Sequence, residues 1–120
     1  MKRPSTLSKG AQYALVYQQG STYVCDVLVM KVLRNGSDVT RVGYSVSRKL
    51  GKAVRRNRIR RQLKEIVRRQ PVKTGWDAVF IARPGAAVCG FDEVWHAVTV
   101  LLARAGLMQE PDEEPNVGLD

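Results

Sequence analysis

Residues 52–69 have the sequence KAVRRNRIRRQLKEIVRR, in which Lys and Arg dominate and Glu65 is the single acid. At about 100° per residue, the apolar residues of this segment fall on one side of a helix. That apolar stripe consists of Ile59, Leu63, Ile66 and Val67. A polar face of one sign lies nearly opposite and consists of Asn57, Arg60, Arg61, Lys64 and Arg68. The segment is therefore predicted to be an amphipathic helix whose apolar stripe packs on a core.

The single sign of the polar face indicates an external anion. Most charged helix faces are solvated surfaces, but these usually alternate in sign, because like charges one turn apart repel. Glu65 can pair locally with Arg61 and Arg69, yet it cannot neutralise the face. Arg outnumbers Lys, which suits bidentate recognition of phosphate oxygens. We therefore favour a phosphate-binding face, which Arg48 and Lys49 extend toward the preceding segment.

The whole chain has the length and charge expected of one basic domain. It has 120 residues and a net charge of +9, which points to nucleic acid first and to an anionic membrane surface second. Residues 1–108 are predicted to form a single domain. Residues 109–120 contain five of the 11 acids and no Lys or Arg, and are predicted to be a disordered acidic tail. Neither a signal peptide nor a membrane span is evident, so a soluble cytoplasmic protein is expected.

Apolar periodicity and turn residues predict the other elements. Helices are expected over residues 8–19 and 91–105. Strands are expected over residues 22–33, where the strand can bend in two, and over residues 41–47 and 76–82. The pair Asn35-Gly36 supplies a hairpin-turn signal after the first of these strands. This order of elements implies an α/β (α+β) fold with one sheet packed against helices.

The residue types available do not assemble a protein active site. A metal-dependent nuclease needs clustered carboxylates, whereas the six acids outside the tail are scattered along the chain. His96 is the single histidine, and we interpret it as a packing or surface residue rather than a general base. Cys25 and Cys89 are far apart and have no Cys or His companions, so buried reduced thiols are expected instead of a disulfide or a zinc site. We expect no catalytic residue and no metal ligand in this chain.

Residues 43–68, GYSVSRKLGKAVRRNRIRRQLKEIVR, resemble the signature of the bacterial ribonuclease P protein component. Its central feature is an Arg-Asn-Arg motif, which is Arg56-Asn57-Arg58 here, after a strand that ends in a (V/I)GxxVSKK-like sequence. The similarity extends more weakly over residues 5–106. The resemblance implies a sandwich of about four strands and three helices, with an unusual left-handed βαβ crossover through the basic helix.

The resemblance also implies a function. The family's protein is a small basic subunit that joins a catalytic RNA and assists removal of the 5′ leader from precursor tRNA. Hydrolysis of the phosphodiester is then the work of the RNA and its Mg²⁺ ions, and the protein contributes affinity for the substrate and support of the RNA. The expected partners are ribonuclease P RNA and precursor tRNA, with no membrane and no small-molecule substrate.

Two sets of site residues follow from the resemblance. The first is expected to contact the catalytic RNA: the resemblance supplies Lys49, Lys52, Arg56, Asn57, Arg58, Arg60, Arg61 and Lys64, and the charged face described above adds Arg48 and Arg68. The second is expected to line a cleft for the single-stranded leader and consists of Tyr13, Tyr17, Lys31, Val79 and Ile81. Tyr13 and Tyr17 can stack on bases of any sequence, although core packing is their plainer interpretation. Lys31 departs from family members that have an aromatic residue there.

Two other hypotheses remain open from the sequence. The chain can be a non-catalytic RNA- or DNA-binding protein, such as a ribosome-associated factor, without a role in tRNA processing. It can also be an autonomous nuclease, although the scattered carboxylates argue against this. Co-purification with a large structured RNA and cleavage by the protein alone are the observations that separate the three.

Overall fold

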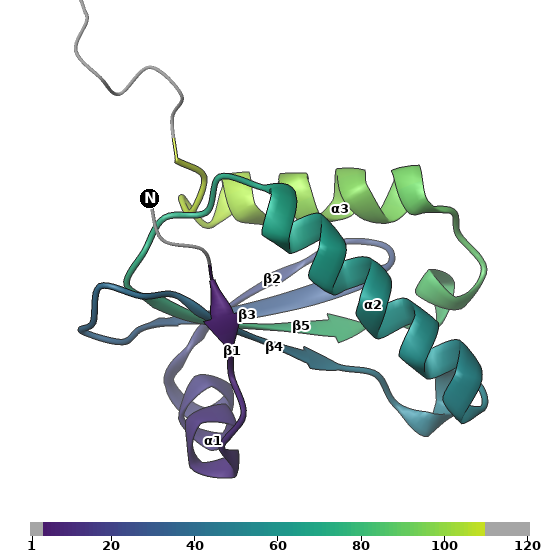
Figure 1. Cartoon of the computed structure of the whole chain (residues 1–120), viewed down its shortest axis with the longest axis horizontal. Helices are drawn as coiled ribbons and strands as arrows, with labels where there is room; N and C mark the ends of the chain where they lie inside the picture. The colour runs from purple at the N-terminus through teal and green to yellow at the C-terminus, as the bar shows by residue number, and fades with distance from the viewer. Residues whose placement is uncertain (1–3, 110–120) are drawn as a thin grey trace, which may run out of the picture.

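A five-stranded sheet with helices on both faces forms the part of the chain that the computed structural model describes, residues 4–109 (Figure 1). Its elements in chain order are β1 (Ser5–Thr6), α1 (Gly10–Gln19), β2 (Ser21–Val24), β3 (Leu28–Arg34), β4 (Arg41–Ser45), η1 (Arg48–Leu50), α2 (Ala53–Arg69), β5 (Trp76–Ala82), η2 (Pro84–Ala87) and α3 (Phe91–Arg104). Helices α2 and α3 cover one face of the sheet, and α1 packs on the other. The predicted α/β fold with three helices is confirmed.

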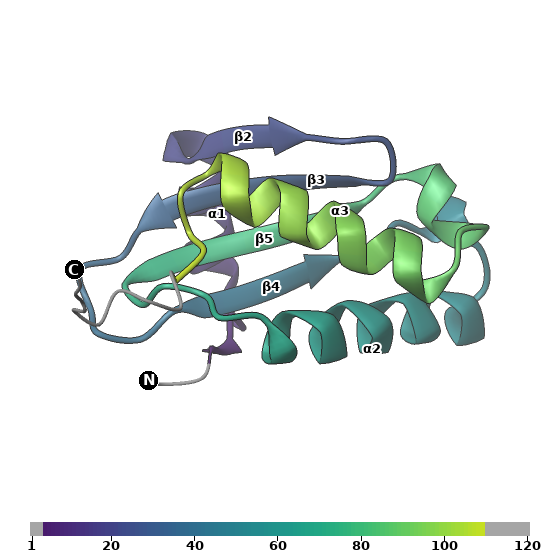
Figure 2. The same ribbon diagram turned by 90° about the horizontal axis from the view of Figure 1, so that it is seen from above.

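The order of strands across the sheet is β1-β4-β5-β3-β2. The neighbours β4 and β5 are parallel and are joined through α2, so they form a βαβ unit. Seen from the helical side in Figure 2, with the strands pointing up, β5 lies to the left of β4, which makes the crossover left-handed. Ordinary βαβ units are right-handed. The unusual crossover implied by the family resemblance is therefore present.

The turn at Asn35-Gly36 does not make a hairpin, so that prediction is wrong. Strand β3 pairs antiparallel with β5, and β5 lies between β3 and β4. The chain does reverse after β3, because Ser37 N–H donates to Asn35 Oδ1 at 2.8 Å and Gly36 has a positive φ of 72°. The hairpin of this region lies earlier, between β2 and β3. The segment expected as a strand over residues 22–33 is thus bent into two strands at residues 25–27, as the prediction allowed.

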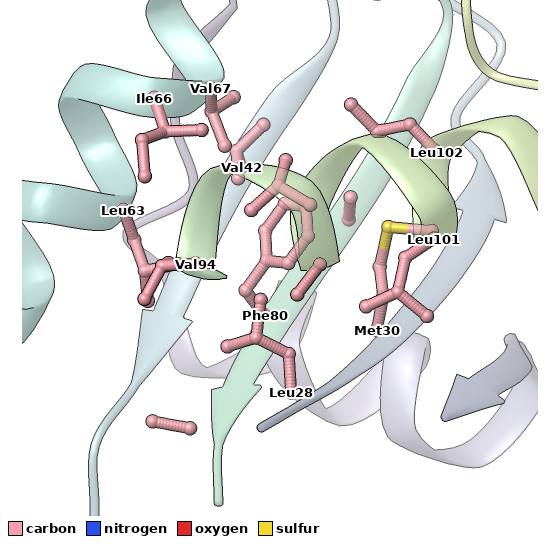
Figure 3. Close-up of a cluster of buried hydrophobic side chains, with 14 of the residues drawn as sticks. Leu28, Met30, Val42, Leu63, Ile66, Val67, Phe80, Val94, Leu101 and Leu102 are labelled. Atoms are coloured by element: carbon pink, nitrogen blue, oxygen red, sulfur yellow. The ribbon is translucent and has the colours of Figure 1, made fainter. Parts of the chain in front are cut away.

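The main hydrophobic core lies between the sheet and the pair α2 and α3 (Figure 3). Alternate residues of β3 and β5 point into it, namely Leu28, Met30, Val32, Ala78, Phe80 and Ala82. The four apolar residues of the predicted α2 stripe are all buried in it, with at most 3% of their surface exposed. Burial of each such side chain stabilises the fold by roughly 1.5–3 kcal/mol. This packing fixes the rotation of α2 and therefore the direction of its basic face.

A smaller core lies under α1 on the opposite face. Leu7, Val16 and Val79 are its fully buried members, and Tyr13 and Ile81 pack against it while staying partly exposed. Strand β1 brings Leu7 to this place, because Leu7 N–H donates to Val42 O at 2.9 Å just beyond the two-residue pairing of β1 with β4. This short strand was not expected from the sequence.

A partly buried ion pair ties β4 to β5 at the start of both strands. The Asp77 side chain is 8% exposed and accepts two hydrogen bonds from the Arg41 guanidinium, at 2.8 and 2.7 Å. Asn35 Nδ2 donates to the same carboxylate at 2.9 Å and to Val39 O at 2.9 Å. The network therefore also holds the connection between β3 and β4.

Other features of the described residues bear on the expectations from composition. Within residues 4–109 no helix is long and apolar enough to cross a membrane. Cys25 and Cys89 are free thiols, as predicted, but both stay partly exposed. Of the predicted acidic tail only Gln109 falls within the described residues, and Gln109 N–H donates to Pro71 O at 2.6 Å. The remainder of that tail lies outside them.

Candidate nucleic-acid interface

A groove of about 680 Å³ lies at the edge of the sheet formed by β1 and the part of β4 beyond it, between α1 and the polar face of α2. It is lined by Thr6, Tyr13, Tyr44, Val54, Asn57, Arg60, Arg61 and Lys64. Four of the residues predicted to bind RNA thus share this groove with Tyr13, which was predicted to bind the leader. The structure therefore joins two sets of residues that the sequence analysis treated as separate surfaces.

A second hollow of about 490 Å³ continues the groove toward the C-terminal end of α2. Thr6, Tyr44, Arg61 and Lys64 line both spaces. The second hollow adds Pro4, Ser5, Glu65, Val67 and Arg68. The two hollows together form one path along α2, and Arg68 joins the path at its far end.

The cations of the groove differ in how far they are already engaged. Arg60 donates to Asn57 Oδ1 at 2.7 Å on the same helix face. The side chains of Arg61 and Lys64 make no hydrogen bond or ion pair with any residue between 4 and 109. Two neighbouring cations without a counter-ion raise the local positive potential, which favours a phosphate in the groove.

At the far end of the groove a carboxylate holds two of the cations. Glu65 pairs with Arg68 through Oε1 and with Arg69 through Oε2, each at 2.6 Å, and not with Arg61 as the sequence analysis allowed. The hydrogen bond from Arg68 lowers the pKa of the Glu65 carboxyl, and the charges of Arg68 and Arg69 act in the same direction. Glu65 therefore stays ionised and competes with phosphate for these two guanidinium groups.

The aromatic wall of the groove depends on a glycine. The ring of Tyr13 lies against Gly43 of β4, where a Cβ atom would come within 2.6 Å of Tyr13 Cζ. Tyr17 lies one turn further along α1, with its ring centroid 6.4 Å from that of Tyr13 and 41% of its surface exposed. Tyr13 thus faces the basic helix, while Tyr17 continues the aromatic surface away from it.

The remaining residues predicted to bind the catalytic RNA lie outside the two hollows. Arg48, Lys49 and Lys52 are exposed just before α2, and Arg58 is exposed on α2 itself. Arg56 is half-buried, and its Nε donates to Gly51 O at 3.1 Å. This contact gives Arg56 a structural task in holding the start of α2, which the sequence analysis did not foresee.

The three looser candidates for the leader cleft differ in how exposed their side chains are. Val79 is fully buried beneath α1, so its prediction as a contact residue is wrong. Val79 is inaccessible because α1 covers this part of the sheet. Ile81 packs against the same small core but keeps some exposed surface. Lys31 is partly exposed, and its Nζ donates to Thr22 Oγ1 on the neighbouring strand at 2.8 Å.

Known proteins share the sequence pattern and the fold of this chain. A family model described as Ribonuclease P matches residues 1–106. The chain belongs to the ribonuclease P protein family. The ribonuclease P protein component of Dehalococcoides mccartyi strain CBDB1 is 40% identical over 120 residues, which are 100% of each chain. That of Clostridioides difficile strain 630 is 38% identical, over 88% of this chain and 95% of the relative.

Solved structures of ribonuclease P proteins share the fold. The protein from Staphylococcus aureus superimposes with a TM-score of 0.80 at 27% identity, over 89% of this chain and 100% of the other. The protein from Thermotoga maritima gives a TM-score of 0.77 at 31% identity, over 83% and 96% of the two chains. The family resemblance that rested on residues 43–68 is thus confirmed over the domain.

The groove of this ribonuclease P protein also contains residues that sequence reasoning missed. Tyr44 was predicted only as part of the strand over residues 41–47, and neither Thr6 nor Val54 was singled out. Val54 is 81% exposed at the first turn of α2, which is an unusual place for a β-branched apolar residue and could have been noticed. No local signal marks Thr6 or Tyr44, because the groove exists only once α1, β4 and α2 are assembled.

Proposed function

We propose that this chain, as the protein subunit of ribonuclease P, binds ribonuclease P RNA through the polar face of α2 and the single-stranded 5′ leader of precursor tRNA along α1. The single observation that carries the proposal is the shared groove, in which Tyr13 faces Asn57, Arg61 and Lys64 across the edge of β4. One strand of RNA passing along it meets an aromatic wall and a cationic wall together. The role of the chain is in tRNA 5′ processing, as expected of the family.

Two kinds of contact would act on RNA in the groove. Arg61 and Lys64 supply charge for phosphates, and the displaced counter-ions make such binding steeply dependent on salt. Tyr13 and Tyr17 supply ring faces, and stacking of a base on an aromatic side chain is worth about 1–3 kcal/mol without a demand on sequence. Contacts of this kind suit a leader whose sequence differs from one precursor to another.

We place the chemistry of phosphodiester hydrolysis on the RNA. Within residues 4–109 no group of three or more His, Cys, Asp and Glu side chains could hold a metal ion. The groove is also a poor site for Mg²⁺ by its chemistry, because its one carboxylate, Glu65, is already paired with Arg68 and Arg69 and the neighbouring side chains are cationic. His96 lies on α3 and lines a different hollow, with the turn between β2 and β3. Mg²⁺ that serves the reaction is therefore expected on the RNA.

Precursor cleavage at low Mg²⁺ tests this function. Four reactions are compared, with a bacterial ribonuclease P RNA alone, the protein alone, both together, and the RNA with an unrelated basic protein of equal net charge. Accurate 5′ cleavage that requires both components supports the proposal. Cleavage by the protein alone would favour an autonomous nuclease, and binding of RNA without rescue would favour a general RNA-binding protein.

A further inference from the structure

Tyr44 occupies the junction of the two hollows beside α2. It belongs to β4, and β1 pairs only with Arg41 and Val42, so Tyr44 lies just past the point where β1 stops covering this edge of the sheet. Its ring stacks on Phe80 of β5, with centroids 6.3 Å apart and an interplanar angle of 13°. Because Phe80 is fully buried in the main core, the position of the Tyr44 ring is fixed.

The hydroxyl group of Tyr44 has no hydrogen-bond partner among residues 4–109. Thr6, Arg61 and Lys64 line both hollows with it; the two cations have no acceptor atom, and the Thr6 hydroxyl makes no hydrogen bond with Tyr44. A half-buried donor without a partner favours an acceptor that enters from outside. A phosphate attracted by the two cations brings acceptor oxygens to this place.

The phenol of Tyr44 also keeps its proton at neutral pH. Burial raises the pKa of Tyr44 above its ordinary value, and the nearby Tyr13 phenol raises it further because two phenolates would repel. A protonated phenol is a neutral hydrogen-bond donor, whereas its neighbours Arg61 and Lys64 are charged, and the salt dependence of RNA binding distinguishes the two kinds of contact. Its hydrogen bond adds affinity without releasing a counter-ion.

We propose that Tyr44 is a further RNA-binding residue, whose hydroxyl donates a hydrogen bond to an RNA phosphate held by Arg61 and Lys64 at the junction of the two hollows. This inference rests on the proposed function in taking RNA as the ligand. The phosphate can belong to the leader of precursor tRNA or to ribonuclease P RNA, since both present the same group.

The conservative variant Tyr44→Phe tests the inference, because it keeps the ring on Phe80 and removes only the hydroxyl. Affinities for precursor tRNA, mature tRNA and ribonuclease P RNA are measured over a range of salt concentrations. The expected result is about tenfold weaker binding of at least one RNA, with the slope of log K against log salt unchanged. The matched variant Arg61→Gln is expected to weaken binding and also to reduce that slope by about one.

The arms of the experiment give distinct answers. A loss with precursor but not with mature tRNA assigns the phosphate to the leader, and a loss with ribonuclease P RNA assigns it to the catalytic RNA. Wild-type affinity of Tyr44→Phe for all three RNAs overturns the inference while leaving the proposed function intact. Failure of the wild-type protein to bind precursor or ribonuclease P RNA would instead contradict the proposed function.

A double-mutant cycle keeps the inference testable if Tyr44→Phe lowers the melting temperature. When Tyr44 and Arg61 hold the same phosphate, the double variant loses less affinity than the sum of the two single losses. A general folding defect would act independently of Arg61, so strictly additive losses overturn the inference.

Discussion

The ring of Tyr13 on α1 lies directly on the backbone of Gly43 in β4. A Cβ atom at position 43 would approach Tyr13 Cζ to 2.6 Å, which is closer than carbon atoms can pack. The missing side chain of Gly43 therefore lets an aromatic ring of α1 reach the edge of the sheet and face the basic helix. This contact shapes the aromatic wall of the groove.

Gly43→Ala is expected to displace the Tyr13 ring. We predict a loss of about 1–3 kcal/mol in the free energy of unfolding, measured in urea, as is usual when a packed site is overfilled. Binding of precursor tRNA should weaken with it. The control is Gly10→Ala at the start of α1, where a Cβ atom meets nothing within 4 Å. Equal stability of both variants would show that Tyr13 does not depend on Gly43.

Tyr17 is expected to contact the leader through its exposed ring. Tyr17→Ala should weaken binding of precursor tRNA by roughly tenfold and leave mature tRNA almost unaffected, because the lost stacking is worth about 1–3 kcal/mol. Leu15→Ala removes an apolar side chain of similar exposure, 47% against 41%, from the same helix. It should leave both affinities unchanged. Equal losses on precursor and mature tRNA for Tyr17→Ala would contradict a leader contact.

Arg41 is expected to stabilise the fold rather than to bind RNA. Arg41→Ala leaves the Asp77 carboxylate buried with Asn35 as its remaining donor, so we predict a loss of about 2 kcal/mol in unfolding free energy. On β3, which pairs with the other side of β5, the Arg34 guanidinium lies 4.9 Å from the centre of the Trp76 ring, a contact worth about 0.5–1 kcal/mol. Arg34→Ala should therefore cost less, and the reverse order in thermal or urea unfolding would refute this assignment.

Glu65 is expected to limit how much of α2 binds RNA. Glu65→Gln frees Arg68 and Arg69, so affinity for ribonuclease P RNA should rise. The slope of log K against log salt should also steepen by about one to two, because each freed cation can contact about one phosphate. Asp92→Asn changes the net charge equally but lies on α3. Should both variants raise affinity by the same amount without a change in slope, the effect would be one of net charge alone.

The ionisation of Glu65 sets the pH range of this competition. Its lowered pKa means that the carboxylate pairs with Arg68 and Arg69 at neutral pH and through the usual range of Glu titration, and releases them only as the pH falls below that range. The difference in RNA affinity between wild type and Glu65→Gln should therefore persist at mildly acidic pH. Its disappearance near the ordinary pKa of Glu, about 4.3, would contradict a lowered value.

Local patterns of sequence were sufficient for the elements that pack directly on the core. The strand expected over residues 76–82 is found, because a continuous apolar run fits a strand that is buried on both faces. The stripe of Ile59, Leu63, Ile66 and Val67 is found as well, because burial of one side imposes a period of 3.6 residues on a helix. The same helical periodicity predicted the basic face opposite the stripe. The direction of the polar face of α2 was thus available from the sequence alone.

Features set by long-range pairing could not be predicted in this way. Asn35-Gly36 does reverse the chain, but turn residues do not say which strand will lie next to β3, and β5 takes that place. The two residues of β1 are too few for any alternation. Val79 was placed in the leader cleft by the family resemblance, and no pattern in the sequence shows that α1 covers this residue.

The central claim is that RNA binds in the groove between α1 and α2, and a pair of double variants tests it most directly. Arg61→Gln with Lys64→Gln removes two charges from the groove, and Arg83→Gln with Arg104→Gln removes two charges from the far side, where these arginines contact Cys25 O and Val24 O. Circular dichroism confirms that each is folded, and precursor cleavage with ribonuclease P RNA is then measured at low Mg²⁺. We predict at least a tenfold loss for the groove pair and near wild-type cleavage for the other. Equal cleavage by the two variants would contradict the account.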